Sequence, residues 1–242
     1  MARALFIIPF YNEERRILID EFALAFKSFN TIDFLLVNDG SSDFTQQIIE
    51  NFSICFSNVK VLNLEKNQGK AEAIRVGILY SKDSGYNYFG YLDADLSTPI
   101  AEVVKLLEFS QINPHLKLIM GSRIKLLGNT IIRSSKRHYL GRIFATIISK
   151  CILKTPIYDT QCGAKIIKED IVYELFKDQF QTRWLFDIEM LLRHKKGYEN
   201  LEETVAEFPL SIWIEKGNTK IKFKEFVVFP YQLIKIYFKN VI

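Results

Sequence analysis

In the stretch Tyr91-Leu92-Asp93-Ala94-Asp95-Leu96-Ser97-Thr98-Pro99, a hydrophobic run ends in two carboxylates with one residue between them. The run itself, 86–92, is aromatic and apolar at odd and even positions alike, which predicts a central strand covered on both faces. If the backbone stays extended, Asp93 and Asp95 project to the same side, because strand side chains repeat every two residues. Paired carboxylates are typical ligands of Mg2+ or Mn2+ when substrate phosphates complete the shell. Alternatively, Asp95 caps a helix that begins near Pro99, and Asp93 lies in a turn.

Composition is that of an ordinary globular protein. The 242 residues are 48% hydrophobic and 25% charged, which suits one large domain or a domain with an appendage. A net charge of +4 allows an anionic ligand or a membrane surface without establishing either. The three cysteines lack metal-ligand spacing and suit a reducing compartment better than a disulfide framework. We expect no membrane-spanning segment, because no uncharged apolar run reaches about 18 residues, and the apolar start predicts a first strand rather than a signal peptide.

Strands and helices alternate along the first half of the chain. The expected strands are 4–9, 34–37, 59–64, 86–92 and 116–120, and the expected helices are 13–29, 44–55, 70–81 and 100–109. This rhythm predicts an α/β fold with a mostly parallel sheet and helices on both faces.

Polar clusters follow three of the expected strands. They are Pro9-Phe10-Tyr11-Asn12-Glu13, Asn38-Asp39-Gly40-Ser41-Ser42 and Asp93-Ala94-Asp95. Because parallel sheets bind ligands beyond the carboxyl ends of their strands, we expect all three clusters to lie at one edge and to contact one ligand. Taken alone, Asp39-Gly40 is also typical of a tight turn.

The sequence has neither of the two common glycine-rich phosphate loops, GxxxxGK[ST] and GxGxxG after a strand. Phosphate charge must therefore be met by a metal ion and side chains. Gly69-Lys70 begins an expected helix, whose free amides and lysine attract anions. The alternative for Lys70 is a solvated lysine in the first turn.

Together these motifs resemble, in order and spacing, the family 2 glycosyltransferases with the GT-A fold. The motifs are those of 9–13, 37–43, 67–70, 93–95 and 121–123, followed by Asp159–Lys165, Arg183–Glu189 and Gly217–Lys220. The later ones are similar to dolichyl-phosphate β-glucosyltransferases and, more loosely, to polyprenyl-phosphate mannose synthases. The resemblance covers nearly the whole chain. It implies a single GT-A domain whose half 1–122 binds the nucleotide sugar and whose half 123–242 binds the acceptor and ends in helices.

The resemblance also implies roles for single residues. The nucleotide-sugar contacts would be Pro9, Tyr11, Glu13, Asp39, Lys70 and Asp93, with Tyr11 against the base. Asp95, with Asp93 beside it, would hold Mg2+ or Mn2+ across the donor diphosphate, where the ion neutralises charge on the leaving group. Arg123 and Arg133 would clamp phosphates, because a guanidinium fork suits phosphate geometry. Lys220 resembles the family's phosphate-binding lysine, and its alternative is one of the solvated lysines of 216–224. The alternative for Arg133 is a surface-loop arginine.

The acceptor determines whether the reaction needs a general base. A sugar hydroxyl must lose a proton during attack, whereas a phosphate monoester, with a second pKa of about 6, is already ionised. Asp187 and Glu189 are the candidate bases, although first-turn acids favoured by the helix dipole are the alternative. We expect an inverting, metal-dependent enzyme, with Asp95, Arg123 and Asp187 as its catalytic residues. It would transfer a hexose, with glucose favoured, from a nucleotide sugar, with UDP favoured, to a polyprenyl or dolichyl phosphate. The closest alternative transfers to a sugar hydroxyl with Asp187 as base.

Membrane contact is expected from two segments, 139–153 and 223–238, that mix apolar and aromatic residues with lysine or arginine. Such segments lie in the lipid interface or pack on a sheet with their lysines outward. The enzyme would then be cytoplasmic and peripheral on the inner face of the membrane. Pro230 is expected to kink or interrupt the last helix.

Two other function classes fit the sequence less well, and no nucleic-acid partner is expected. A sugar nucleotidyltransferase needs a Gly-rich, Arg-containing loop after the first strand, which 10–13 does not supply. A non-catalytic basic membrane or RNA-binding module would bind in a salt-sensitive way that ignores Mg2+.

Overall fold

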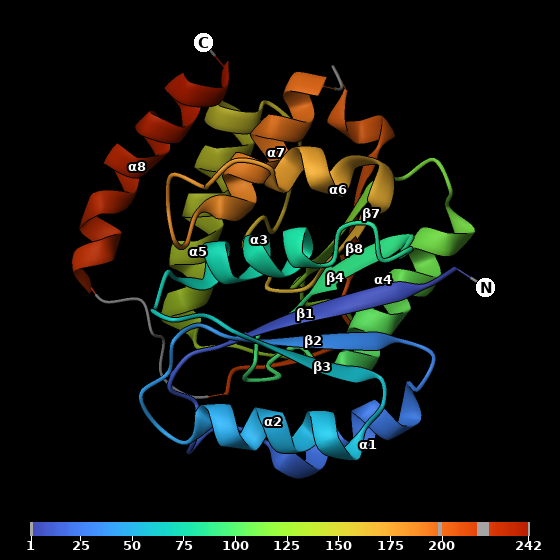
Figure 1. Cartoon of the computed structure of the whole chain (residues 1–242). Helices are drawn as coiled ribbons and strands as arrows, with labels where there is room; N and C mark the ends of the chain where they lie inside the picture. The colour runs from blue at the N-terminus through green and yellow to red at the C-terminus, as the bar shows by residue number, and fades with distance from the viewer. Residues whose placement is uncertain (1, 198–199, 217–222, 242) are drawn as a thin grey trace.

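The computed structural model describes residues 2–197, 200–216 and 223–241 (Figure 1). Within them, one mixed sheet has the strand order β3-β2-β1-β4-β7-β5-β8. Its strands are β1 (Ala4–Phe10), β2 (Asp33–Asn38), β3 (Val59–Asn63), β4 (Tyr88–Tyr91), β5 (Leu118–Ser122), β7 (Lys165–Lys168) and β8 (Val205–Pro209). All neighbours run parallel except β7, which is antiparallel to β4 and β5. A small parallel pair, β6 (Thr130–Ile132) and β9 (Ile212–Ile214), lies apart from this sheet.

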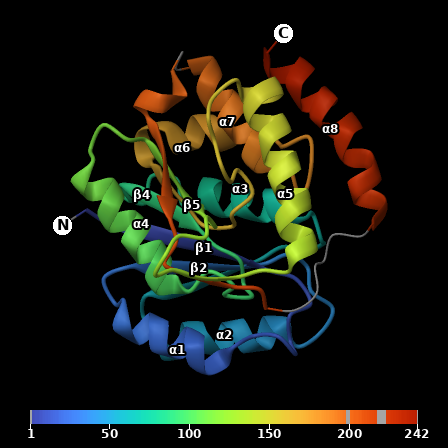
Figure 2. The ribbon, with the colours of Figure 1, turned by 180° about the vertical axis from the view of Figure 1, so that it is seen from behind.

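Helices cover both faces of the main sheet (Figures 1 and 2). One face packs against α1 (Ile19–Ser28), α2 (Thr45–Cys55) and α4 (Ile100–Ile112). The other packs against α3 (Lys70–Tyr80), α6 (Glu169–Phe176) and α7 (Phe186–Gly197), with α5 (Ser135–Ile147), its π-helical continuation Ile148–Leu153, and α8 (Phe223–Val241) beyond them. The alternation within β1 explains the two layers, because Phe6 and Ile8 enter the first core and Leu5 and Ile7 the second. Among the described helices, none combines the length and apolar character needed to cross a bilayer.

The expected α/β fold is confirmed, and the first five strands and four helices lie close to their expected ranges. The first helix begins at Ile19 rather than at 13, because the chain turns after Asn12, whose φ is +47°, and Glu13 accepts turn hydrogen bonds. Of the expected kink or interruption at Pro230, the interruption is wrong, since α8 continues through it, and the kink stays a prediction. Burial of Phe229, Leu233 and Ile236 offsets the hydrogen bond that proline cannot make.

Candidate active site

The carboxyl ends of β1, β2 and β4 meet at one edge of the sheet, as the polar clusters predicted. Phe10 pairs with Asn38, and Ile7 pairs with Tyr91, so the residues that follow each strand come together. This edge therefore gathers Tyr11, Asp39 and Asp93, and every further feature of the site is arranged around it.

The two carboxylates Asp93 and Asp95 lie in a tight turn, not in an extended strand. β4 ends at Tyr91, and the Leu96 amide donates to the Asp93 carbonyl (3.2 Å) with φ of +51° at Leu96. The assumption of extended backbone was therefore wrong. The helix-cap alternative is also excluded, because α4 follows Pro99 and the Asp95 carboxylate instead accepts from the Ser97 amide (2.9 Å).

Electrostatics make this turn suitable for a cation. Burial, and after it the negative charge of Asp93, raises the pKa of Asp95. A divalent cation would relieve the repulsion between the two carboxylates. Among the described residues, no group of three or more His, Cys, Asp or Glu is arranged around a metal position. An ion held here would need oxygens from a bound phosphate as its further ligands, which is the usual arrangement for Mg2+.

Lys70 forms an ion pair with this turn. Its Nζ lies 2.5 Å from Asp93 Oδ1, so the solvated-lysine alternative does not hold. Burial opposes its charge, but Asp93 and Asp187 raise the pKa of Lys70 above its ordinary value. On the other side, a Cβ on Gly163 would fall 1.9 Å from Asp93 Oδ2, so the backbone of the 159–165 loop closes directly over Asp93.

Asp187 lies buried at the start of α7, with its Oδ1 bound by two donors. The Tyr91 hydroxyl donates to this oxygen, and Lys165 Nζ lies 2.8 Å from it. Lys165 is completely buried and also donates to the carbonyls of Thr160 (3.1 Å) and Cys162 (2.7 Å). Burial and the Asp187 charge together raise the pKa of Tyr91 well above its usual value, so the phenol stays a donor. Asp187 is therefore fixed from two sides.

Glu189, the other candidate base, has both carboxylate oxygens bound by groups of the protein. Its two oxygens accept from the Gln181 amide (2.7 Å) and from Arg193 Nη2 (2.9 Å), and the side chain is fully buried.

Asp39 fastens the loop that leads into α3. It accepts from Asn67 Nδ2 (2.9 Å) and from the backbone amides of Gln68 and Gly69 (both 2.8 Å). Burial raises the pKa of Asp39, and the two amide hydrogen bonds work against that rise. In this way Asp39 positions the loop that ends in Lys70, and its contact with a nucleotide stays a prediction.

The residues after β1 lie at the rim of the site. Tyr11 is exposed, whereas Glu13 is buried, with its amide bonded to Thr45 Oγ1 (2.8 Å) and its carboxylate 3.5 Å from Arg16. Pro9 lies within β1 and pairs with Val37 of β2.

Arg123 forms a bidentate ion pair with Asp159. Its Nε and Nη2 lie 2.6 and 2.7 Å from the two carboxylate oxygens, and its backbone amide donates to the same group. Both side chains are buried, and although burial opposes it, Arg123 lowers the pKa of Asp159 to about 2. Asp159 uses Nε and one N–H of Nη2, which leaves the donors of Nη1 and the second N–H of Nη2 outside the pair, so the expected phosphate contact of Arg123 stays a prediction.

The remaining predicted phosphate contacts lie away from this turn or outside the described chain. Arg133 follows β6 and is half-buried, and its guanidinium lies against Gly141 of α5. Lys220 lies outside the described residues.

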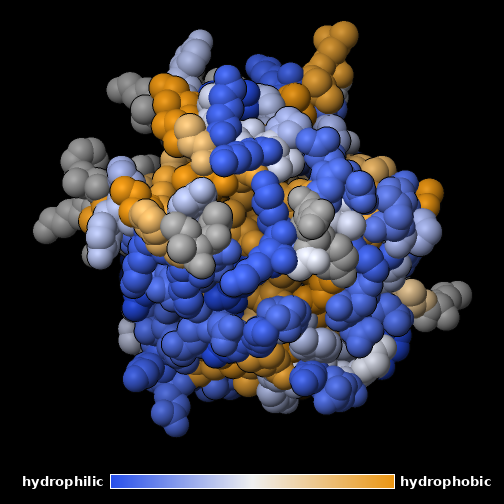
Figure 3. Space-filling view, turned by 90° about the horizontal axis from the view of Figure 1, so that it is seen from above, coloured by the Kyte–Doolittle hydropathy of each residue, from blue (hydrophilic) through white to orange (hydrophobic). Residues whose placement is uncertain are grey.

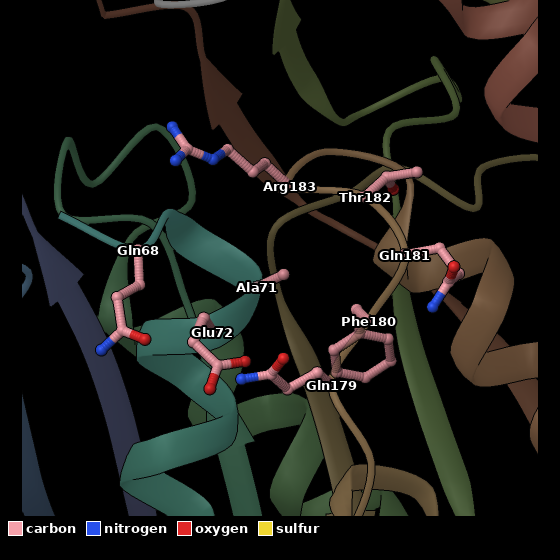
Figure 4. Close-up of a pocket in the computed structure, with 8 residues that line it drawn as sticks. All are labelled: Gln68, Ala71, Glu72, Gln179, Phe180, Gln181, Thr182 and Arg183. Carbon is pink, nitrogen blue, oxygen red and sulfur yellow. The ribbon is translucent and has the colours of Figure 1, made fainter.

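A pocket of about 350 Å³ opens beside the 67–69 loop (Figure 4). It is lined by Gln68, Ala71, Glu72, Gln179, Phe180, Gln181, Thr182 and Arg183. The exposed Arg183 side chain lies across Gly69, where an added Cβ would come within 2.9 Å of it. Arg183 thus lines the pocket next to the loop that Asp39 holds, and its positive charge partly opposes the rise that burial causes in the pKa of Asp39.

Sequence reasoning missed Lys165, Tyr91 and Arg183 as site residues. One signal was available for Lys165, since a lysine beside two isoleucines in a short apolar run has to find a partner if it is buried.

Comparison with known proteins agrees with this geometry. The model of the family described as "Glycosyl transferase family 2" matches residues 5–176. A dolichyl-phosphate beta-glucosyltransferase of Trichomonas vaginalis, ALG5C, is 32% identical, over 96% of this chain and 69% of the relative. The Drosophila melanogaster dolichyl-phosphate beta-glucosyltransferase is 33% identical, over 89% and 68%.

Among solved structures, the chain is similar to glucosyl-3-phosphoglycerate synthase from Mycobacterium tuberculosis in complex with Mn2+, UDP-glucose and phosphoglyceric acid. The TM-score is 0.73 at 15% identity, with 99% of this chain and 79% of the other covered. This likeness establishes the shared GT-A fold.

Proposed function

This chain belongs to glycosyl transferase family 2, and we propose that it transfers glucose from UDP-glucose, with inversion, to a dolichyl or other polyprenyl phosphate. The relatives' names support glucose and the lipid phosphate, and the UDP-glucose bound by the structural neighbour supports the donor.

The single observation that carries this proposal is the fixed carboxylate of Asp187. Its Oδ1 is bound by Tyr91 and Lys165, and the side chain is buried. A general base must reach the proton it removes and accept it, which a carboxylate held by a buried ammonium is poorly placed to do. A phosphate acceptor brings its own negative oxygen and needs no base. The arrangement therefore supports a phosphate acceptor over a sugar hydroxyl.

The donor diphosphate would be met by the turn at the end of β4. Asp93 and Asp95 would hold Mg2+ or Mn2+, which when bound would neutralise charge on the leaving nucleoside diphosphate. Lys70 lies beside them at the positive end of α3 and would attract the phosphates. Asp39 keeps Lys70 in place through the loop, and the exposed Tyr11 would lie against the base.

A polyprenyl phosphate resides in a bilayer, so we also propose that the enzyme works at the cytoplasmic face of a membrane and contacts it peripherally. Both the lipid acceptor and the basic apolar segments support this location.

The test is a transfer assay with purified protein, Mg2+ or Mn2+, a panel of radiolabelled nucleotide sugars, and detergent-dispersed polyprenyl phosphate. Label from UDP-glucose should enter the organic phase. If label from each donor entered only soluble glycans and none entered the organic phase, the proposal that the acceptor is a lipid phosphate would be overturned.

Two variants separate the roles of the carboxylates in the same assay. Asp95→Asn should abolish transfer, whereas Asp187→Asn should keep activity within about tenfold of wild type, since general-base catalysis contributes about 100-fold or more. Complete loss in Asp187→Asn with normal folding and donor binding would favour the sugar-hydroxyl alternative.

A further inference from the structure

Helix α8 is apolar on two opposite faces. Its inner face buries Phe229, Leu233 and Ile236 in the core that it shares with α7. Its outer face carries Tyr231, Ile234 and Phe238, which are 67%, 56% and 57% exposed. At 100° per residue these three side chains point away from the buried ones. A surface helix normally turns polar residues outward, so the outer face is suited to contact something apolar.

Helix α5 carries a second exposed apolar stripe. Tyr139, Ile143 and Ile147 follow one another at intervals of four residues and are all exposed. The two helices are neighbours, since the Phe144 and Phe229 rings lie 6.1 Å apart, and Figure 2 shows them side by side. We call the six outward side chains of the two helices the α5–α8 surface. Orange apolar residues reach the surface at the upper left of Figure 3, on the side where these helices lie.

Positive charge is concentrated in the same two segments. Residues 135–154 and 223–241 together contain eight Lys and Arg and one Glu. The remaining chain holds 24 Lys and Arg against 27 Asp and Glu, so it is net negative although the whole protein is +4. Lys150, Lys235 and Lys239 are exposed beside the apolar stripes. Apolar side chains bordered by lysines complement the interface of an anionic bilayer.

Helix α5 begins at the rim of the active site, and α8 packs beside it. Residues 214–216 are tied to the turn that carries Asp93 and Asp95, because the Ile214 amide donates to the Ser97 carbonyl (3.0 Å) and the Lys216 amide to Ser97 Oγ (3.3 Å). The start of α5 is tied to the same segment, since the Ser134 amide donates to Glu215 (3.0 Å). A surface against which these helices rest would therefore lie next to the site.

We propose that the α5–α8 surface docks on an anionic bilayer and so brings the site to the headgroup of its membrane-borne acceptor. This inference rests on the proposed function for the identity of the acceptor, but the docking itself is a separate property. A second copy of the chain could cover the same side chains, and the test includes that outcome.

The experiment is flotation of the full chain with vesicles of phosphatidylcholine alone or with about one-third phosphatidylserine, without donor or acceptor. Wild type should float with the anionic vesicles, and added salt should weaken binding. The variant Tyr231→Ser/Ile234→Ser/Phe238→Ser should lose at least tenfold in partition coefficient. A matched control is Leu24→Ser/Ile54→Ser/Ile112→Ser, which removes three apolar side chains that are at least as exposed, from α1, α2 and α4, and should leave vesicle binding unchanged. Circular dichroism checks that both variants fold.

Three outcomes would overturn docking. These are no vesicle binding by wild type, equal losses in both triple variants, and a wild-type dimer that the α8 variant converts to a monomer. Transfer assays separate this inference from the proposed function. The α8 variant should keep its turnover on detergent-dispersed polyprenyl phosphate and lose it on vesicle-embedded acceptor. Vesicle binding by wild type without transfer to lipid from any donor would reject the proposed function and leave docking intact.

Discussion

Replacing Lys165 by Met should lower the free energy of unfolding by about 3–5 kcal/mol, because it leaves the Asp187 carboxylate buried without its cation. The side chains of Lys165 and Asp187 are 0% and 5% exposed, and Nζ lies 2.8 Å from Oδ1. At that separation and an effective dielectric constant of 20, the attraction is about 6 kcal/mol, most of which offsets desolvation. The Tyr91 hydroxyl still contacts Asp187 in the variant, so we expect the lower end of the range.

Urea unfolding followed by circular dichroism measures this change, provided that the transition is two-state. Lys177→Met is the matched control, because Lys177 pairs with Glu174 on the open surface, and its urea midpoint should stay unchanged. The double variant Lys165→Met/Asp187→Leu should recover stability relative to Lys165→Met, since it removes both charges. A loss of less than about 1 kcal/mol in Lys165→Met would refute the reasoning that a buried charge depends on this lysine.

Three further predictions address the rest of the site and the core. Gly163→Ala should reduce transfer at least tenfold by displacing Asp93, whereas Gly197→Ala, with open space around its Cβ, should not; equal activities would contradict the contact. Burial lowers the pKa of His194 to about 4, whereas in the unfolded chain this histidine has its ordinary pKa of 6.5. As the pH falls from 6.5 toward 4, His194 is protonated in the unfolded chain but not in the folded one, so the free energy of unfolding should decrease over this range. His194→Gln should flatten this dependence of the urea midpoint, and an unchanged slope would exclude His194 as its source. Asp39→Asn places a side-chain amide against three hydrogen-bond donors and should lower the free energy of unfolding by about 1–3 kcal/mol. Hydrogen exchange at the backbone amides of 68–69 should become faster, and unchanged exchange would count against this role of Asp39.

The parallel part of the sheet could be predicted because its strands are buried on both faces and appear as continuous apolar runs. β7 was missed because it has four residues, with a lysine at each end, although it lies in the middle of the sheet. β6 and β9 have three residues each, too few for a recognisable alternation.

For the site, the strand-edge rule correctly brought Asp39 and Asp93 together, because parallel register alone fixes that result. Sequence could not indicate what each carboxylate binds. Arg123 contacts Asp159, which lies 36 residues away in the sequence, and Tyr91 contacts Asp187, which lies 96 residues away. At such separations the sequence spacing of two residues does not indicate whether they are close in the fold.

The antiparallel β7 has a consequence for the order in which the chain is made. β4 and β5 are neighbours only through β7, so a ribosome that has released the first 122 residues leaves both strands with open edges. Unpaired strand edges invite pairing with other chains. The open edge of β4 is covered when residue 168 emerges, and the second edge of β5 is covered when β8 follows. A truncated chain that ends before β7 should therefore aggregate, and the nascent chain acquires Lys165, the counter-charge of Asp187, in the same step that joins β4 to β5.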